Sequence, residues 1–321
     1  MEDSLLFFQE EGQSKEKIYK ILFTGLDGAG KTSIILALQR EYSKIALLEP
    51  TRGAQRTNFK FLGKEISEWD LGGQKSYRIS YLKNPSKYFE DTEIAIYVID
   101  ILDPSRVLES LSYFYDVIEK FRELKIEPPI YVFFHKYDPK LIHNVKNEID
   151  SEIQKLQKEM VETANYRMIR FYRTSIYDPF TIMSPMSKML LELFPKSELL
   201  QRTIEEYAKI LDCEGLIILE KNSIILGSCF KDDDSKKKLS GTIAYFLSLN
   251  DVFEEMELEK QEDQILLKKS GNHFIFKPVT MKETALPYYM LGLKKHNPFD
   301  TDFLDNDFNA FVNIFKDIVR N

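Results

Sequence analysis

The segment Gly25–Thr32 constrains the fold of this chain more than any other stretch. It reads GLDGAGKT and matches the pattern G-x-x-x-x-G-K-[ST] at every constrained position. An apolar run at Ile18–Phe23 leads into it, and a helix-forming run at Ser33–Gln39 leads out. A strand, a glycine-rich turn and a helix in this order predict a phosphate-binding loop, because backbone N–H groups and a helix N-terminus both attract an anion.

The residues of this loop have separate expected roles. Glycine lets the backbone wrap closely around phosphate oxygens, since it carries no Cβ. Lys31 adds a positive charge near the outer phosphates, and the hydroxyl of Thr32 is placed to ligate Mg²⁺. A glycine-rich turn without a ligand is the alternative, which the fit of all constrained positions disfavours. The predicted nucleotide-binding residues of the loop are Asp27, Gly28, Ala29, Gly30, Lys31, Thr32 and Ser33.

A second motif, DLGGQ at Asp70–Gln74, follows a predicted hairpin of strands at 58–61 and 65–69. The carboxylate of Asp70 can hold the water shell of a metal ion, and Gly73 can turn its N–H toward a terminal phosphate. The side-chain amide of Gln74 can orient an attacking water with its donor and acceptor groups. Alone, the motif also fits a strand end followed by a turn. After the phosphate loop, it favours a metal-dependent phosphate site.

A third motif, HKYD, occupies residues 135–138 after an apolar strand predicted at 130–134. This strand and another predicted at 94–100 suit the middle of a parallel sheet. The carboxylate of Asp138 can accept both the ring N–H and the exocyclic amino group of guanine, a pair that adenine does not present. The stem of Lys136 can lie across the base plane, and the ring N–H of His135 can donate to a base nitrogen. Alone, the motif is typical of a solvated strand end; as the third motif in this order, it favours guanine.

The composition limits the class of protein. A chain of 321 residues is long enough for two domains, and its 43% hydrophobic and 30% charged content is typical of soluble globular proteins. With a net charge of −7, we expect no nucleic-acid partner. Cys213 and Cys229 form no CxxC pair, which favours packed thiols in a reduced, cytoplasmic setting. No run reaches the length of a membrane span and no lipidation motif occurs, so we expect membrane contact only through a partner.

The rest of the chain predicts further elements without a catalytic constellation. The acidic run Asp232–Asp234 is expected to cap a helix; acids are favoured at a helix N-terminus without any metal, although a metal site is the alternative. The expected elements are helices at 105–124, 141–161 and 181–193 and a strand at 168–172, then helices at 198–211, 235–249 and 302–318 and strands at 215–220, 223–227, 257–268, 273–279 and 288–293.

In their order, the runs GLDGAGKT, PTRG, WDLGGQ, HKYD and TSIYD resemble the motifs of a Ras-superfamily GTPase domain over residues 18–194. The phosphate loop and WDLGGQ are similar to the Arf branch. The HKYD and TSIYD runs and the presence of a C-terminal domain are similar to the Rag/Gtr branch, which we weigh more heavily. The resemblance implies an α/β fold: a Ras-like P-loop domain at 17–195 with a mostly parallel sheet flanked by helices, then an α+β roadblock/longin-type domain at 196–321.

The resemblance also implies a set of functional residues. They comprise Gln74, Lys31 and Thr51 in catalysis, Mg²⁺ held by Thr32, Thr51 and Asp70, and nucleotide contacts from Gly73, His135, Lys136, Asp138, Ser175 and Ile176. Arg52 follows Thr51 and is either an internal arginine finger or a solvated loop residue, of which we favour the second. His135 stands where the superfamily commonly has asparagine, and Asp27 where Ras has glycine.

The function implied is slow hydrolysis of GTP to GDP in a nucleotide-dependent switch. An exchange factor, an activating protein and effectors are implied as partners, together with homo- or heterodimerisation through residues 196–321. A scaffold that holds nucleotide without hydrolysing it and assembles partners through the C-terminal domain is the alternative. An ATPase is disfavoured by Asp138.

Overall fold

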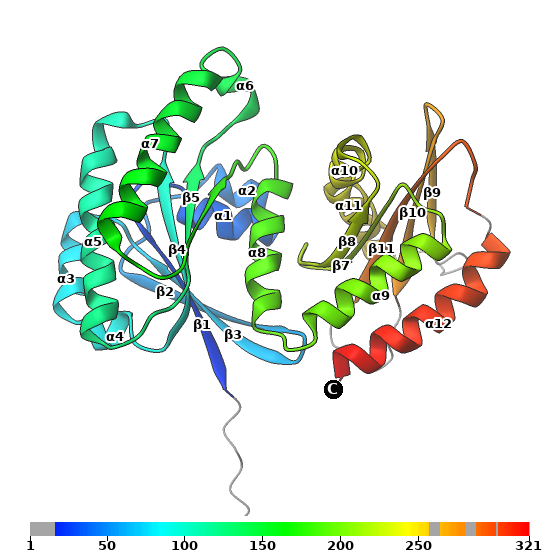
Figure 1. Ribbon diagram of the computed structural model, residues 1–321, viewed down its shortest axis with the longest axis horizontal. Coiled ribbons are helices and arrows are strands. Elements are labelled where there is room, and N and C mark those ends of the chain that lie inside the picture. Colours follow the sequence, from blue (N-terminus) through cyan, green and yellow to red (C-terminus); the bar gives the residue numbers. More distant parts are fainter. Residues whose placement is uncertain (1–16, 257–263, 280–286, 300, 321) are drawn as a thin grey trace, which may run out of the picture.

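The computed structural model describes residues 17–256, 264–279, 287–299 and 301–320, which form two α/β units joined by a short connection (Figure 1). The first unit is built on a six-stranded sheet with strand order β2-β3-β1-β4-β5-β6. Neighbouring strands are parallel, except that β2 runs antiparallel to β3. The strands are β1 (Ile18–Gly25), β2 (Ala54–Phe61), β3 (Lys64–Leu71), β4 (Thr92–Asp100), β5 (Ile130–His135) and β6 (Ile169–Arg173).

Strand β1 lies between β3 and β4, so the chain extends the sheet to one side of β1 and then to the other. In an open parallel sheet, such a change of direction opens a crevice at the carboxyl ends of the strands. The phosphate loop leaves β1 at this point. The fold therefore places the predicted anion site where ligands of this kind of sheet bind.

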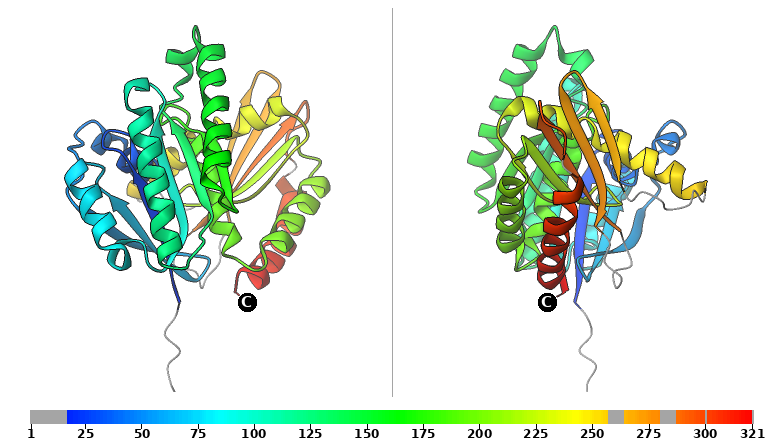
Figure 2. Two further views of the ribbon diagram at one scale, coloured as in Figure 1. Left: turned by 60° about the vertical axis from the view of Figure 1, so that its left-hand side comes forward. Right: turned by 90° about the vertical axis from the view of Figure 1, so that its right-hand side faces the viewer.

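Helices cover both faces of the first sheet. Helices α3, α5 and α7 pack on one face, whereas α1 and α8 pack on the other (Figures 1 and 2). Strands β4 and β5 are apolar along most of their length because both of their faces are buried. The helices are α1 (Lys31–Leu38), α2 (Tyr42–Ile45), α3 (Lys75–Lys83), α4 (Pro85–Tyr88), the 3₁₀ turn η1 (Pro104–Arg106), α5 (Val107–Glu123), α6 (Pro139–Ile142), α7 (Lys146–Ala164) and α8 (Phe180–Glu192).

The second unit has a five-stranded antiparallel sheet of order β8-β7-β11-β10-β9. Helices α9 and α12 pack on one face, and α10 and α11 on the other. The predicted α/β class is confirmed for the first unit, and the second sheet is compatible with a longin-type unit. The elements are α9 (Ser197–Ile210), β7 (Gly215–Glu220), β8 (Ile225–Phe230), α10 (Asp233–Ser240), α11 (Ile243–Glu255), β9 (Ile265–Lys269), β10 (Asn272–Val279), β11 (Tyr288–Lys295) and α12 (Thr301–Arg320).

The structure corrects several predicted boundaries in the first unit. The segment before β2 contains the short helix α2, and β2, whose strand was expected at 58–61, already begins at Ala54. The helix predicted at 141–161 is divided into α6 and α7. Val145, the residue just before α7, is exposed, whereas Ile153 and Met160 of α7 are buried.

Two corrections concern the second unit. The helix predicted at 235–249 is divided into α10 and α11, because glycine at 241 disfavours helix continuation and the Thr242 hydroxyl donates to the carbonyl of Leu239. Part of the strand predicted at 257–268 lies outside the described residues, and the described strand β9 begins at Ile265. The helix cap at Asp232 is confirmed, since its carboxylate accepts the Ser235 N–H at 2.6 Å. Among the residues that the structure describes, no group of three or more histidine, cysteine, aspartate and glutamate side chains could hold a metal ion.

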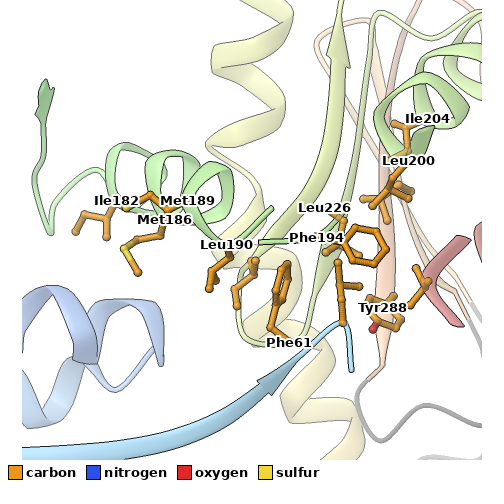
Figure 3. Packing of buried hydrophobic residues seen from close by; sticks show 14 of the residues in the cluster. Phe61, Ile182, Met186, Met189, Leu190, Phe194, Leu200, Ile204, Leu226 and Tyr288 are labelled. Atoms are coloured by element: carbon orange, nitrogen blue, oxygen red, sulfur yellow. The ribbon is translucent and has the colours of Figure 1, made fainter. Parts of the chain in front are cut away.

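One continuous apolar cluster joins the two units. Figure 3 shows Leu190 of α8 and Phe194, which follows α8, beside Leu226 of β8 and Phe61 of β2. The N–H of Ile225 also donates to the Ser187 hydroxyl of α8 at 2.7 Å. Helix α8 thus contacts both sheets, and the boundary proposed at 195/196 falls between α8 and α9. In the described part of the chain, no helix is both long and apolar enough to span a membrane.

Candidate functional site

Two adjoining cavities lie around the phosphate loop at the carboxyl end of β1. The larger, of about 300 Å³, is lined by Asp27, Gly28, Gly30, Lys31, Thr32, Ser33, Leu48, Glu49, Pro50, Thr51, Gly73 and Gln74. The smaller, of about 240 Å³, shares Asp27 and Gly28 and extends past Ala29 to Asp100 and Lys136. The predicted phosphate-site residues therefore line one cavity, the larger one. They come from the loop after β1, from the segment before β2 and from the segment after β3.

Lys31 lies at the first position of α1 with its side chain buried against the phosphate loop. Its ammonium group donates to the carbonyls of Gly25, at 3.1 Å, and Leu26, at 2.8 Å. Burial lowers the pKa of Lys31 to about 8, and the carboxylates of Asp70 and Asp27 oppose this shift. A buried ammonium group with only neutral carbonyl partners gains strongly from an anion nearby.

The residues predicted to hold a metal ion converge. The hydroxyls of Thr32 and Thr51 are 2.7 Å apart, and the Thr32 hydroxyl donates to Oδ2 of Asp70 at 2.5 Å. The second carboxylate oxygen of Asp70, Oδ1, is buried without a hydrogen-bond partner. Mg²⁺ prefers hard oxygen ligands, and a buried unpaired carboxylate oxygen costs free energy unless it meets a cation or donor. This oxygen set therefore fits Mg²⁺.

Gly73 packs directly against the phosphate loop. A Cβ added at Gly73 would lie 2.1 Å from the amide nitrogen of Asp27, so no other residue fits without moving the loop. Gln74 follows at the position just before α3, half-buried, and lines the larger cavity. The close packing of Gly73 thus fixes how near Gln74 lies to the phosphate loop.

His135 lies beneath the loop instead of in an open base pocket. Its side chain is buried, its Nδ1 lies 2.9 Å from the Thr174 hydroxyl, and its Nε2 would be 2.8 Å from a Cβ at Gly30. Gly30 has φ of 96°, so it needs glycine both for this conformation and for the approach of the ring. The predicted contact of His135 with the base stays a prediction; in the structure, the ring bridges the phosphate loop and the segment after β6.

The burial of His135 predicts a distinct acid sensitivity. Burial, assisted by the charge of Lys136, lowers the pKa of His135 to about 3. As the pH falls below about 6.5, the His135 imidazole takes up a proton in the unfolded chain but not in the folded one. The free energy of unfolding therefore keeps its full value above this pH and decreases as the pH falls toward 3. We expect the free energy of unfolding to fall about 1.4 kcal/mol per pH unit more steeply in this window than in the His135→Asn variant. Denaturant titrations between pH 7.5 and 4 measure this difference.

His143→Asn, which removes an imidazole that the fold leaves exposed, provides the matched control. Parallel pH profiles for the wild type and His135→Asn would contradict the neutral, buried state of His135.

The residues predicted to recognise the base lie together at the carboxyl ends of β5 and β6. The carboxylate of Asp138 is buried and accepts a hydrogen bond from the Ser175 hydroxyl through Oδ1. Lys136 has φ of 62° and donates to Asp100 at 2.6 Å, and Ile176 is half-buried against the core. A carboxylate oxygen accepts more than one hydrogen bond, so both oxygens of Asp138 keep the capacity to accept donors from a base.

The remaining predicted residue, Arg52, points into solvent. Its side chain is 83% exposed, and its guanidinium lies 3.9 Å from Glu49. This position agrees with a solvated loop residue.

The sequence did not predict the roles of Thr174 and Asp100, which contact His135 and Lys136, because pairing between strand ends has no local sequence pattern. It also missed Arg78, Arg106 and Glu109, although the spacing of the last two, three residues apart at a helix start, brings them to one face.

A sheet with the phosphate loop after β1, a carboxylate near the end of β3 followed by two glycines, and a carboxylate after β5 defines a P-loop protein of the Ras-superfamily GTPase class. Residues 20–254 match the family model of the Gtr1/RagA G protein conserved region. The chain belongs to this family of GTP-binding GTPases.

Individual relatives agree with both branches of the resemblance. ADP-ribosylation factor-like protein 3 of Chlamydomonas reinhardtii is 39% identical over 127 residues, covering 39% of this chain and 67% of that protein. ADP-ribosylation factor-like protein alp41 of Schizosaccharomyces pombe is 39% identical over 105 residues, covering 33% of this chain and 53% of that protein. Ras-related GTP-binding protein A of Dictyostelium discoideum is 23% identical over 252 residues, covering 76% of this chain and 79% of that protein.

Among solved structures, that of the Arl6 BBS3 small GTPase from Trypanosoma brucei with bound nucleotide analogue GppNp is 20% identical. It covers 54% of this chain and 96% of that chain, with a TM-score of 0.41.

Proposed function

We propose that this chain binds GTP with Mg²⁺, hydrolyses it slowly to GDP and acts as a nucleotide-dependent switch. The observation that carries the proposal is the convergence of Thr32, Thr51 and Asp70, with one buried carboxylate oxygen unpaired, at a cavity that Gln74 also lines. Membership of a GTP-binding GTPase family supports the nucleotide.

In this proposal, different residues of the chain bind the phosphates, the metal ion, the attacking water and the base. Lys31 places its ammonium group at the phosphates, and the loop amides from Asp27 to Ser33 surround them. Bound Mg²⁺ would be held by the hydroxyls of Thr32 and Thr51 and, directly or through water, by Asp70, and it would neutralise charge on the phosphate oxygens. Gln74 orients the attacking water, and Asp138 accepts the guanine N–H groups.

Slow turnover follows from the lining of the site. In the described part of the chain, no arginine is among the residues that line the larger cavity, and Arg52 faces solvent. An arginine at the transferred phosphoryl group accounts for about 10³- to 10⁵-fold in the rate of related reactions. An activating protein that supplies such a group is therefore part of the proposal.

The central experimental test is the Gln74→Leu variant in single-turnover hydrolysis of GTP with Mg²⁺. We expect the rate to fall about 100-fold, because leucine can neither accept from nor donate to water. The affinity for GTP should change by less than about twofold, since Gln74 makes no contact that holds the loop. Exposed Lys75, one residue further on, provides the control Lys75→Ala.

An unchanged hydrolysis rate in Gln74→Leu would remove Gln74 from the mechanism. GTP that stays intact in the wild type after long incubation with Mg²⁺ would instead favour the non-hydrolysing scaffold.

We further propose that the second unit forms a homo- or heterodimer, through which the nucleotide state acts on effectors. An exposed apolar stripe on α11, formed by Tyr245, Val252, Phe253 and Met256, supports this, because surface patches of this kind mark protein interfaces. The ion pair of Arg40 with Asp251, at 2.7 Å, links the end of α1 to α11. Sedimentation of the full chain, alone and with partner chains, tests it; a monomer in every mixture would remove this part of the proposal.

A further inference from the structure

A closed series of contacts surrounds the outer side of the phosphate loop. We call it the loop ring and define it by Asp27, Gly73, Arg78, Glu109 and Arg106. Arg106 donates to the carbonyl of Asp27 at 3.0 Å and to its carboxylate at 2.7 Å. Its Nε donates to Glu109 at 3.3 Å, and Glu109 also accepts from Arg78. Arg78 donates to the carbonyl of Gly73 at 2.8 Å, and Gly73 packs on the amide of Asp27.

The first function of this ring concerns charge. The carboxylate of Asp27 lies at the edge of the larger cavity, where an unpaired negative charge would repel a triphosphate. Burial alone would raise the pKa of Asp27, but the hydrogen bond and charge of Arg106 outweigh it and lower the pKa, so the carboxylate stays ionised. Arg106 neutralises this carboxylate and, through the second bond to the backbone carbonyl, also fixes the loop itself.

Its second function concerns the segment that carries Gln74. The buried guanidinium of Arg78 holds the Gly73 carbonyl and lies 5.1 Å from the Tyr113 ring. Its charge is balanced by Glu109, the same carboxylate that Arg106 contacts. The peptide between Gly73 and Gln74 is thereby tied to the phosphate loop from two sides. A displacement of Arg106 would be transmitted to both.

We propose that Arg106 and Glu109 are positioning residues that couple the phosphate loop to Gly73 and so place Gln74 where it can orient the water that attacks the outer phosphate. This inference rests on the proposed hydrolysis of GTP. Arg106 lines the smaller cavity but not the larger one, and Glu109 is among the lining residues of neither; in this proposal both act through Asp27 and Arg78.

Magnitudes separate this role from ordinary stabilisation. The side chains of Arg106 and Asp27 are 34% and 42% exposed, and an ion pair with this exposure contributes little to folding, about 0–1 kcal/mol. Glu109 is 43% exposed but also balances the charge of Arg78, whose side chain is only 9% exposed, so loss of Glu109 also costs stability. A displacement of about 1 Å in a reacting group lowers a rate by up to about 100-fold. Loss of Arg106 should therefore change catalysis far more than the melting temperature.

The test compares Arg106→Gln and Glu109→Gln in the full chain by single-turnover GTP hydrolysis, GTP and GDP affinity and thermal melting. We expect hydrolysis to fall at least about tenfold in both variants, with little change in melting in Arg106→Gln. Arg106→Gln should also weaken the binding of GTP more than the binding of GDP, because the unpaired carboxylate of Asp27 then repels the triphosphate more strongly than the diphosphate. Adding Asp27→Asn to Arg106→Gln should restore the GTP affinity, which a merely structural role of Arg106 would not do. Arg122→Gln, which removes a similarly exposed ion pair with Glu119 from the same helix, is the matched control.

Wild-type hydrolysis rates in Arg106→Gln and Glu109→Gln, together with an impaired Gln74→Leu, would overturn the ring and leave the proposed function standing. Equal loss of GTP and GDP affinity, without rescue by Asp27→Asn, would also overturn it. A wild-type chain that binds GTP without hydrolysing it would refute the proposed hydrolysis and the ring's role with it, whereas nucleotide binding would remain.

Discussion

Replacing Lys31 with alanine is expected to weaken the binding of GTP and GDP about 100- to 10,000-fold. The ammonium group is buried beside the phosphate loop, and each charge-assisted hydrogen bond that it makes to a phosphate is worth about 1.5–3 kcal/mol. The fold should survive, since without nucleotide the charged form of Lys31 is disfavoured by burial. Calorimetric or fluorescence titration of the nucleotide-free protein measures the loss.

The pH dependence provides a second readout of Lys31. Because its pKa without nucleotide is about 8, the group is largely neutral above that pH and must take up a proton when phosphates bind. Nucleotide affinity in the wild type should therefore fall as the pH rises above about 8, and this fall should be absent in Lys31→Ala. Lys44→Ala, which removes an exposed ammonium group from α2, is the control. Unchanged affinity in Lys31→Ala would contradict the assignment of the phosphate site.

Replacing Asp138 with asparagine is expected to lower GTP affinity about 1,000-fold. The carboxylate accepts two guanine N–H groups, whereas an asparagine amide offers one acceptor and turns its NH₂ group toward a donor. Sites that hydrogen-bond their ligand reject an unmatched partner by about 10⁴-fold. Asparagine retains an oxygen for the Ser175 hydroxyl, so the local structure should persist.

A base with a carbonyl in place of the exocyclic amino group should compensate for this change. Xanthosine triphosphate presents such an acceptor, and we expect Asp138→Asn to bind it more tightly than the wild type does. Competition titrations with GTP, ATP and xanthosine triphosphate measure the change in preference. The exposed Asp212→Asn is the control for loss of one charge. Equal binding of the three nucleotides by the wild type would show that Asp138 does not read the base.

The sequence predicted those parts of the site that depend on local patterns. The phosphate loop and Asp138 each follow a strand and Asp70 lies near the end of one, and strand ends of a parallel sheet meet at one edge, so their convergence was predictable. The contact between Thr51 and Thr32 was implied only by resemblance, because Thr51 lies in an irregular segment whose path no periodicity determines.

The position of His135 and the contacts of the loop ring could not be predicted from the sequence, because both depend on contacts between segments that are far apart in the chain. The sequence predicted that the ring N–H of His135 can donate to a base nitrogen, and this stays a prediction. The orientation of the imidazole depends on the space left by Gly30 and on a partner, Thr174, from the neighbouring strand end. The ring joins Asp27 to Arg106, 79 residues further along the chain. Contacts of this range arise from packing of α5 on the sheet, which hydrophobic periodicity predicts only as a face and not as individual pairs.

The most direct test of a guanine-nucleotide switch is identification of the nucleotide that the full chain carries. Protein purified gently in the presence of Mg²⁺ is denatured, and the released nucleotide is separated by chromatography before and after incubation. We predict a guanine nucleotide, with bound GTP converted slowly to GDP during the incubation. Recovery of ATP or ADP in its place would contradict the central claim.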